Sequence, residues 1–139
     1  MGRLETLRDW ALGYDGYEGL LKLNALVTTS GDGGISADGS ESVEATYIDG
    51  SEERTAYITI RAVVPWSEGS DSFNAEAATL MEGWADWLRA LPAADYPTLD
   101  GGKVTDVTPT YTLPQLEGIS ETQRLAVYKL EIKFGIYLD

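Results

Sequence analysis

Carboxylates are the side chains of this sequence that could do chemistry, because it contains no histidine and no cysteine. Without histidine the chain lacks the commonest general base and the commonest metal ligand, and without cysteine it lacks a thiol nucleophile. Three candidates, Glu76, Glu82 and Asp86, fall on the polar face of an expected helix, where charges are usually solvated. No carboxylate spacing predicts a Mg²⁺ or Ca²⁺ site. We therefore expect no enzyme activity, no metal and no cofactor.

A glycine-rich stretch at residues 30–40, SGDGGISADGS, is the second place where a ligand could bind. It lacks the Gly-Lys-Ser/Thr ending of a phosphate-binding loop, and its glycine spacing does not fit a dinucleotide fingerprint. It also fails as a calcium loop, because Asp32 and Asp38 lack the alternate-position ligands and the terminal glutamate. The stretch is therefore expected to be a flexible loop at about residues 30–41.

A β-hairpin after this stretch is the element on which the expected fold is built. Residues 42–48 and 55–64 alternate between apolar and polar side chains, a pattern typical of strands. Asp49-Gly50 between them is a strong turn dipeptide, because glycine accepts positive φ and aspartate can hydrogen-bond its own backbone. The charged residues at 51–54 are expected to form the tip of this hairpin, and its strands the centre of a sheet.

Two helices are expected to cover one face of that sheet. Residues 4–12 have apolar positions at spacings of three and four, as an amphipathic helix does. Residues 74–91 carry a longer apolar stripe that ends before Pro92, which cannot continue a helix. Residues 16–29 are ambiguous, with a strand favoured near 25–29.

The last third of the chain is expected to add further strands. Residues 103–112 suit a strand at an edge or with a bulge, because Pro109 cannot donate to a ladder, and residues 114–120 suit a turn. Residues 126–138 alternate for longer than the usual length of about five or six residues. Part of this strand is therefore expected to reach beyond the domain or to pair with another copy.

These elements predict one α+β domain over residues 1–139. Its sheet is expected to be mainly antiparallel, with four to five strands and with helices packed on one face. The residues expected in its core are Ile58, Ile60, Leu80, Trp84, Trp87, Leu88, Leu130, Ile132 and Phe134.

The chain is strongly acidic, with 23 Asp and Glu against 10 Lys and Arg and a formal net charge of −13. This balance disfavours a general nucleic-acid binder, which needs cations to neutralise phosphates. It suits simple solubility, a surface that must not hold DNA, or one that imitates DNA. No apolar run is long enough to span a bilayer, and the first ten residues lack the apolar core of a signal peptide. A soluble protein with no membrane partner, which stays in the cell that made it, is expected.

The order of these features resembles a family of small tailed-phage proteins. YIDGSEER at residues 47–54 is followed by an alternating strand, an acidic linker and a helix that carries ADWL at residues 85–88. This order and spacing are similar to those of phage minor capsid proteins and of the tail terminators, also called tail completion proteins, of long-tailed phages. The opening helix and the alternating C-terminal strand at 128–138 add to the likeness.

The resemblance implies a structural virion protein with a sheet flanked by helices and no catalytic residues. Such a protein forms a hexameric ring at the head-proximal end of the tail tube, stops tube polymerisation and joins the tail to the head connector. Its partners would be further copies of itself, the tail tube protein and the head–tail connector protein. DNA would pass through the lumen without specific binding. The protein would reside in the neck or tail of the virion after assembly in the host cytoplasm.

The net charge has a purpose in such a ring, since an acidic lining would repel DNA. That idea would be wrong if the acidic residues faced outward and Lys22, Lys103 and Lys129 lined the hole. Alternative interpretations are an acidic DNA mimic that inhibits a nucleic-acid enzyme, another neck component such as a head completion protein or a tube subunit, and a small carboxylate-metal enzyme. The candidate subunit contacts are Asp49, Glu52, Glu53, Arg54, Lys129, Glu131 and Lys133.

Overall fold

The computed structural model describes residues 2–25 and 30–139. Over these residues it contains two helices and eight strands. The first element, a helix, and the last, a long strand, are both predicted from the sequence. The elements are α1 (Arg3–Ala11), β1 (Leu21–Leu23), β2 (Gly33–Ala37), β3 (Ser42–Thr46), β4 (Glu52–Pro65), α2 (Asp71–Ala90), β5 (Thr98–Leu99), β6 (Gly102–Pro109), β7 (Gln115–Ser120) and β8 (Leu125–Leu138), with a 3₁₀ turn at Ala93–Asp95.

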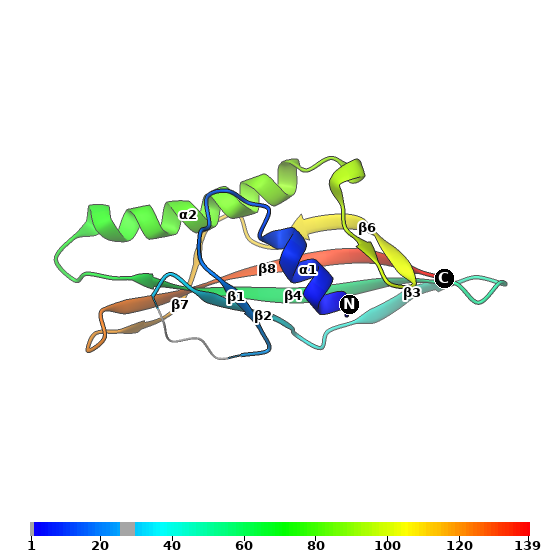
Figure 1. Cartoon of the computed structure of the whole chain (residues 1–139), viewed down its shortest axis with the longest axis horizontal. Coiled ribbons are helices and arrows are strands. Elements are labelled where there is room, and N and C mark those ends of the chain that lie inside the picture. Colours follow the sequence, from blue (N-terminus) through cyan, green and yellow to red (C-terminus); the bar gives the residue numbers. More distant parts are fainter. Residues whose placement is uncertain (1, 26–29) are drawn as a thin grey trace.

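β4 and β8 are the two central strands, and each has 14 residues. They pair antiparallel over their whole length, from Glu52 opposite Leu138 to Pro65 opposite Leu125. The strand order is β1-β2-β4-β8-β6-β5, with β3 also paired to β4 and β7 also paired to β8. β1 and β2 run parallel, and the other pairs are antiparallel. The sheet is therefore elongated along β4 and β8 (Figure 1).

Alternation in β4 and β8 builds the face of the sheet that the helices cover. Ile60, Ile132 and Phe134 are fully buried on this face, in one core cluster with Trp84 of α2. Burying one such side chain stabilises a fold by about 1.5–3 kcal/mol. Among the other expected core residues, Ile58, Leu88 and Leu130 are buried, while Leu80 and Trp87 are partly buried against the core.

The fold is thus broadly α+β, but its sheet has eight strands where four or five were expected. One of the extra strands, β2, lies inside the stretch expected to be a flexible loop. Ile35 of β2 pairs with Ile60 and is 1% exposed. A Cβ atom at Gly33 would lie 2.3 Å from the carbonyl oxygen of Arg61 and 3.1 Å from the Tyr17 hydroxyl. The glycine therefore marks a close approach of packed groups.

β7 lies where a turn was expected over residues 114–120, and it changes the role of β8. One edge of β8 pairs with β4, and the other pairs with β7 over 125–129 and with β6 over 132–138. Between them, the Thr110 N–H donates to the Glu131 carbonyl over 2.9 Å. The expectation that β8 pairs with another copy is therefore wrong, because its own chain occupies both edges.

The remaining boundaries differ by a few residues. α2 begins at Asp71, before the expected start at residue 74, and it ends at Ala90, ahead of Pro92. The strand with Pro109 carries the predicted irregularity, a register shift between Val104 and Asp106. β1 occupies 21–23, and most of the strand favoured near 25–29 lies outside the described residues.

Candidate assembly surfaces

The turn between β3 and β4 is held by short hydrogen bonds. The Gly50 N–H donates to the Tyr47 carbonyl over 3.0 Å, the Tyr47 N–H donates to the Ser51 carbonyl over 2.9 Å, and Gly50 has φ +89°. Asp49 Oδ1 accepts from the Ser51 hydroxyl at 2.6 Å and from the Ser51 N–H at 3.0 Å. These bonds, the hydroxyl first, lower the pKa of Asp49. The turn therefore presents an ionised carboxylate.

The tip of this hairpin, residues 47–50, is more apolar than sequence reasoning indicated. Ile48 is fully exposed, and Tyr47 next to it is exposed as well, as is Val43 farther along β3. The tip projects past the C-terminal end of the sheet (Figure 1). Single exposed hydrophobes are common, but neighbouring ones on a projecting element mark contact surfaces. One sequence feature could have predicted the exposure of Ile48. This residue directly precedes Asp49-Gly50 and therefore lies inside the turn instead of in a strand.

The charged residues expected at the tip lie in β4 and are engaged within the chain. Arg54 pairs with Glu52 at 2.8 Å and with Glu41 at 3.3 Å, and its hydrogen bond with Glu52 is the main cause that raises the pKa of Arg54. Glu53 accepts a hydrogen bond from the Tyr47 hydroxyl, which raises the pKa of Tyr47. These charges are therefore engaged within the hairpin, and their expected role in subunit contacts stays a prediction.

The face of the sheet opposite the helices, called the open face from here on, carries all four lysines. Antiparallel sheets commonly leave one face to solvent. By strand register these lysines are Lys22 of β1, Lys103 of β6, and Lys129 and Lys133 of β8. The helix layer on the other face of the sheet carries exposed carboxylates on α2. They are Glu76, Glu82 and Asp86.

Lys129, Glu131 and Lys133 follow one another along the open face, as three of the expected contact residues. Lys129 Nζ lies 5.8 Å from the ring centroid of Tyr111, and Glu131 accepts from the Thr110 hydroxyl at 3.2 Å. Glu117 of β7 adds a carboxylate to this face, held by Arg61 Nε at 2.9 and 3.0 Å. The open face is therefore mixed in charge.

A second exposed apolar region lies along β7, away from the hairpin tip (Figure 1). Its exposed side chains are Leu116 and Ile119 of β7 and Leu113 just before it. A register shift between Leu116 and Gly118 interrupts the pairing of β7 with β8. Irregularities of this kind protect an edge strand from indiscriminate pairing. This region differs from the tip in shape and in sequence.

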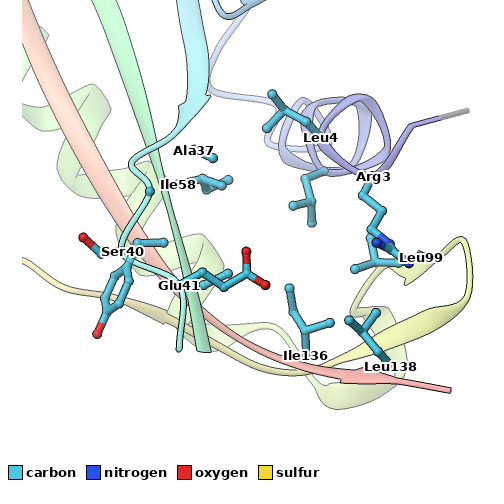
Figure 2. Close-up of a pocket in the computed structure, with 13 residues that line it drawn as sticks. Arg3, Leu4, Ala37, Ser40, Glu41, Ile58, Leu99, Ile136 and Leu138 are labelled. Atoms are coloured by element: carbon cyan, nitrogen blue, oxygen red, sulfur yellow. The ribbon is translucent and has the colours of Figure 1, made fainter. Parts of the chain in front are cut away.

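An apolar pocket opens between α1 and the end of the sheet near the base of the hairpin (Figure 2). It encloses about 240 Å³. Arg3 and Glu41 bring charges to it from different elements, and Arg3 Nε donates to the Asp100 carbonyl at 2.9 Å. Its apolar lining is made by Leu4, Leu7, Ala37, Ala56, Ile58, Leu99, Ile136 and Leu138.

Groups that could do chemistry are sparse in the described part of the chain. Residues 2–25 and 30–139 contain no cluster of three or more acidic residues placed to hold a metal ion. Tyr17 is buried, and burial, followed by the charge of Asp32, raises its pKa, but its hydroxyl donates to the Leu20 carbonyl at 2.7 Å. Within the same residues, neither helix combines the length and apolar character needed to cross a membrane.

Comparison with known proteins gives weak likenesses only. No protein-family model and no curated protein matches the chain. One similar solved chain comes from the virion of a native gene transfer agent particle, with 14% identity, 94% of this chain and 84% of that chain covered, and a TM-score of 0.46. Another has 16% identity, coverages of 97% and 89%, and a TM-score of 0.39. Neither score is high enough to carry an argument about this chain.

Proposed function

We propose that this chain is a structural virion protein of a long-tailed phage, and that it serves as the tail terminator. Copies of it close into a hexameric ring at the head-proximal end of the tail tube. The ring stops polymerisation of the tube protein and joins the tail to the head connector. In this role the chain is not an enzyme and needs no cofactor.

The observation that carries this proposal is that the subunit bears unlike surfaces at separate places. A ring repeats one heterologous contact until it closes, so each subunit needs two different complementary surfaces. The projecting tip with Ile48 and the pocket bordered by Arg3 are one such pair. The apolar region along β7 and the open face are then left for the tube protein and the connector.

The sequence resemblance supports the same role, and the fold gives its segments structural meaning. YIDGSEER spans the hairpin turn and the start of β4. ADWL lies in α2, where Ala85 and Leu88 are buried and Trp87 packs against the core. One segment thus shapes a projecting surface, and the other fastens the covering helix.

The distribution of charge sets the orientation of the subunit in the proposed ring. An acidic lumen repels the DNA that slides through it, because like charges raise the energy of the polyanion there. Lys22, Lys103 and Lys129 share the open face. The open face must therefore point away from the hole, and the helix side, with Glu82 and Asp86 of α2, must point toward it.

The competing interpretation as a DNA mimic finds no support on the open face. A mimic needs carboxylates arrayed at duplex-like intervals, whereas this face alternates Lys129, Glu131 and Lys133. A head completion protein or a tube subunit would use similar surfaces at another position along the neck, and only the location of the chain in a particle separates these roles from a terminator.

The decisive experiment is a reconstruction of the particle that contains this chain. The expected result is six copies in one ring between the tail tube and the connector, with the helix side toward the lumen. As a second measurement, purified chain is added to polymerising tube protein, which should then give capped tubes of reduced length. A chain found along the whole tube, or one without effect on tube length, would contradict the terminator role.

A further inference from the structure

The hairpin tip has the form of a knob that its own chain does not cover. Tyr47 and Ile48 are exposed at its end, and the ladder between Thr46 and Glu52 holds the turn at the end of β3 and β4. The tip points past the end of the sheet (Figure 1). It is therefore a preformed apolar projection, which loses little conformational freedom when it binds.

The pocket beside α1 has the form of a matching hole. Its walls come from α1, β4, β5, β8 and the connection between β2 and β3 (Figure 2). Its volume of about 240 Å³ exceeds what one water molecule needs. Leu4, Ile136 and Leu138 line it, as Figure 2 shows, so it favours an aliphatic occupant.

The charges next to the knob and the hole complement each other. Asp49 follows Ile48 directly, and its lowered pKa keeps it ionised. Arg3 borders the hole and, among the described residues, has no carboxylate within ion-pair distance; its Nε donates to a backbone carbonyl. The carboxylate at the border of the hole, Glu41, pairs with Arg54 at 3.3 Å, and Arg54 also pairs with Glu52 at 2.8 Å. An apolar knob that brings one anion therefore meets an apolar hole that offers one unpaired cation.

The chain cannot bring its own knob to its own hole. The hole lies at the base of the hairpin, bordered by Gly39, Ser40 and Glu41 just before β3. The tip lies at the far end of the same hairpin, and β3 and β4 are paired between the two. An occupant with the chemistry of the tip must therefore come from another copy.

We propose that the hairpin tip of one copy, led by Tyr47 and Ile48, inserts into the pocket beside α1 of the next copy, with Asp49 placed against Arg3. The proposal rests on the proposed ring, because it names the contact that the ring would repeat. Knob and hole are separate surfaces, so each copy can donate to one neighbour and accept from the other.

Cysteine cross-linking tests this contact directly, because the chain has no cysteine of its own. The test variant is Ile48→Cys with Ser40→Cys, which places one thiol on the knob and one at the border of the hole. A short bismaleimide is used, since it tolerates a longer Cα–Cα span than a disulfide does. The matched control is Ile48→Cys with Thr122→Cys, whose second thiol lies on the exposed turn before β8.

The expected result at high protein concentration is a ladder of cross-linked products that ends at a closed ring in the test variant and not in the control. A product that stops at the dimer would support the knob-in-hole contact but contradict the ring. Absence of products in the test variant, or equal products in the control, would overturn the contact while leaving the terminator role to the particle reconstruction.

A second measurement keeps the test independent of cross-linking yield. Tyr47→Ser and Arg3→Glu, each added to the Ile48→Cys/Ser40→Cys background, should reduce cross-linked product at least several-fold. Gly69→Ser, at a site with open space around it, should leave the yield unchanged. Circular dichroism and thermal unfolding of each variant establish that it is folded. Undiminished product in the folded Tyr47→Ser and Arg3→Glu variants would overturn the contact.

Discussion

The indole of Trp84 lies nearly flat against the ring of Tyr17, with centroids 4.7 Å apart and planes 24° apart. This contact joins α2 to the segment between α1 and β1, in addition to the direct contact of Trp10 of α1 with Trp87 of α2, whose ring centroids are 6.2 Å apart. Tyr14 stacks on Trp84 as well, with centroids 5.9 Å apart. The three rings therefore form an aromatic bridge within the covering layer.

Shortening Tyr17 should reveal how much this bridge contributes. Tyr17→Phe removes the hydrogen bond to Leu20 and should lower the free energy of unfolding by about 1 kcal/mol. Tyr17→Ala also removes the ring and should lower it by about 3–5 kcal/mol. Urea unfolding followed by tryptophan fluorescence measures both values. Tyr111→Phe, at a partly exposed site, is the control and should change stability by less than about 0.5 kcal/mol.

Alkaline pH should weaken the fold through the same residue. Burial raises the pKa of Tyr17 above its ordinary value of 10.0, so the folded state keeps a proton that the unfolded state releases. Stability is then fully present below about pH 10 and falls as the pH rises toward the raised pKa. Unfolding of the wild type and of Tyr17→Phe is compared at increasing pH. The stability difference between them should shrink above about pH 10; a constant difference would contradict the assignment.

A methyl group added to β2 should test why that strand contains glycine. Gly33→Ala would place a Cβ atom 2.3 Å from a β4 carbonyl oxygen and 3.1 Å from Leu21, and the resulting overpacking should cost about 1–3 kcal/mol. Gly118→Ala in β7 meets nothing within 4 Å and should be close to neutral. Thermal or urea unfolding measures both. Equal effects of the two substitutions would show that backbone freedom, and not space, explains Gly33.

Two substitutions in the hairpin should show that its role in assembly does not depend on its stability. Arg54→Ala removes ion pairs with Glu52 and Glu41 that lie near the surface, so it should change the free energy of unfolding little. Ile48→Asp, at a fully exposed site, should leave the unfolding free energy within about 0.5 kcal/mol and abolish assembly on the tube. Unfolding curves and tube lengths read the two effects. Assembly retained in folded Ile48→Asp would contradict the contact role of the tip.

Local sequence patterns predicted the structure correctly where a residue's environment depends mainly on its neighbours in sequence. The apolar stripe over residues 74–91 predicted α2, and the alternation around Ile60 and Ile132 predicted β4 and β8 with their buried faces. Asp49-Gly50 predicted the turn. In each case the period of apolar residues, 3.6 or 2, reports on the element itself.

The same patterns failed where long-range packing outweighed local preference. Glycines in GGISA favoured a loop, yet β2 is a strand because Ile35 pairs with Ile60 and Gly33 fits against β4 and Tyr17. The length of β8 suggested a partner copy, but β6 and β7 fill its second edge. Strand pairing depends on which segments meet in space, and periodicity carries no information about that.

The sequence by itself determined the long strands, the two helices, the hairpin turn and the acidic balance without histidine or cysteine, because these follow from side-chain type and spacing. Only the tertiary structure decided that Arg54 pairs with Glu52 and Glu41 within the hairpin while Ile48 stays exposed, that all four lysines share one face, and that an apolar pocket opens beside Arg3. The physical reason is that exposure, ion pairing and cavities are properties of contacts between distant segments, which form only when the sheet assembles.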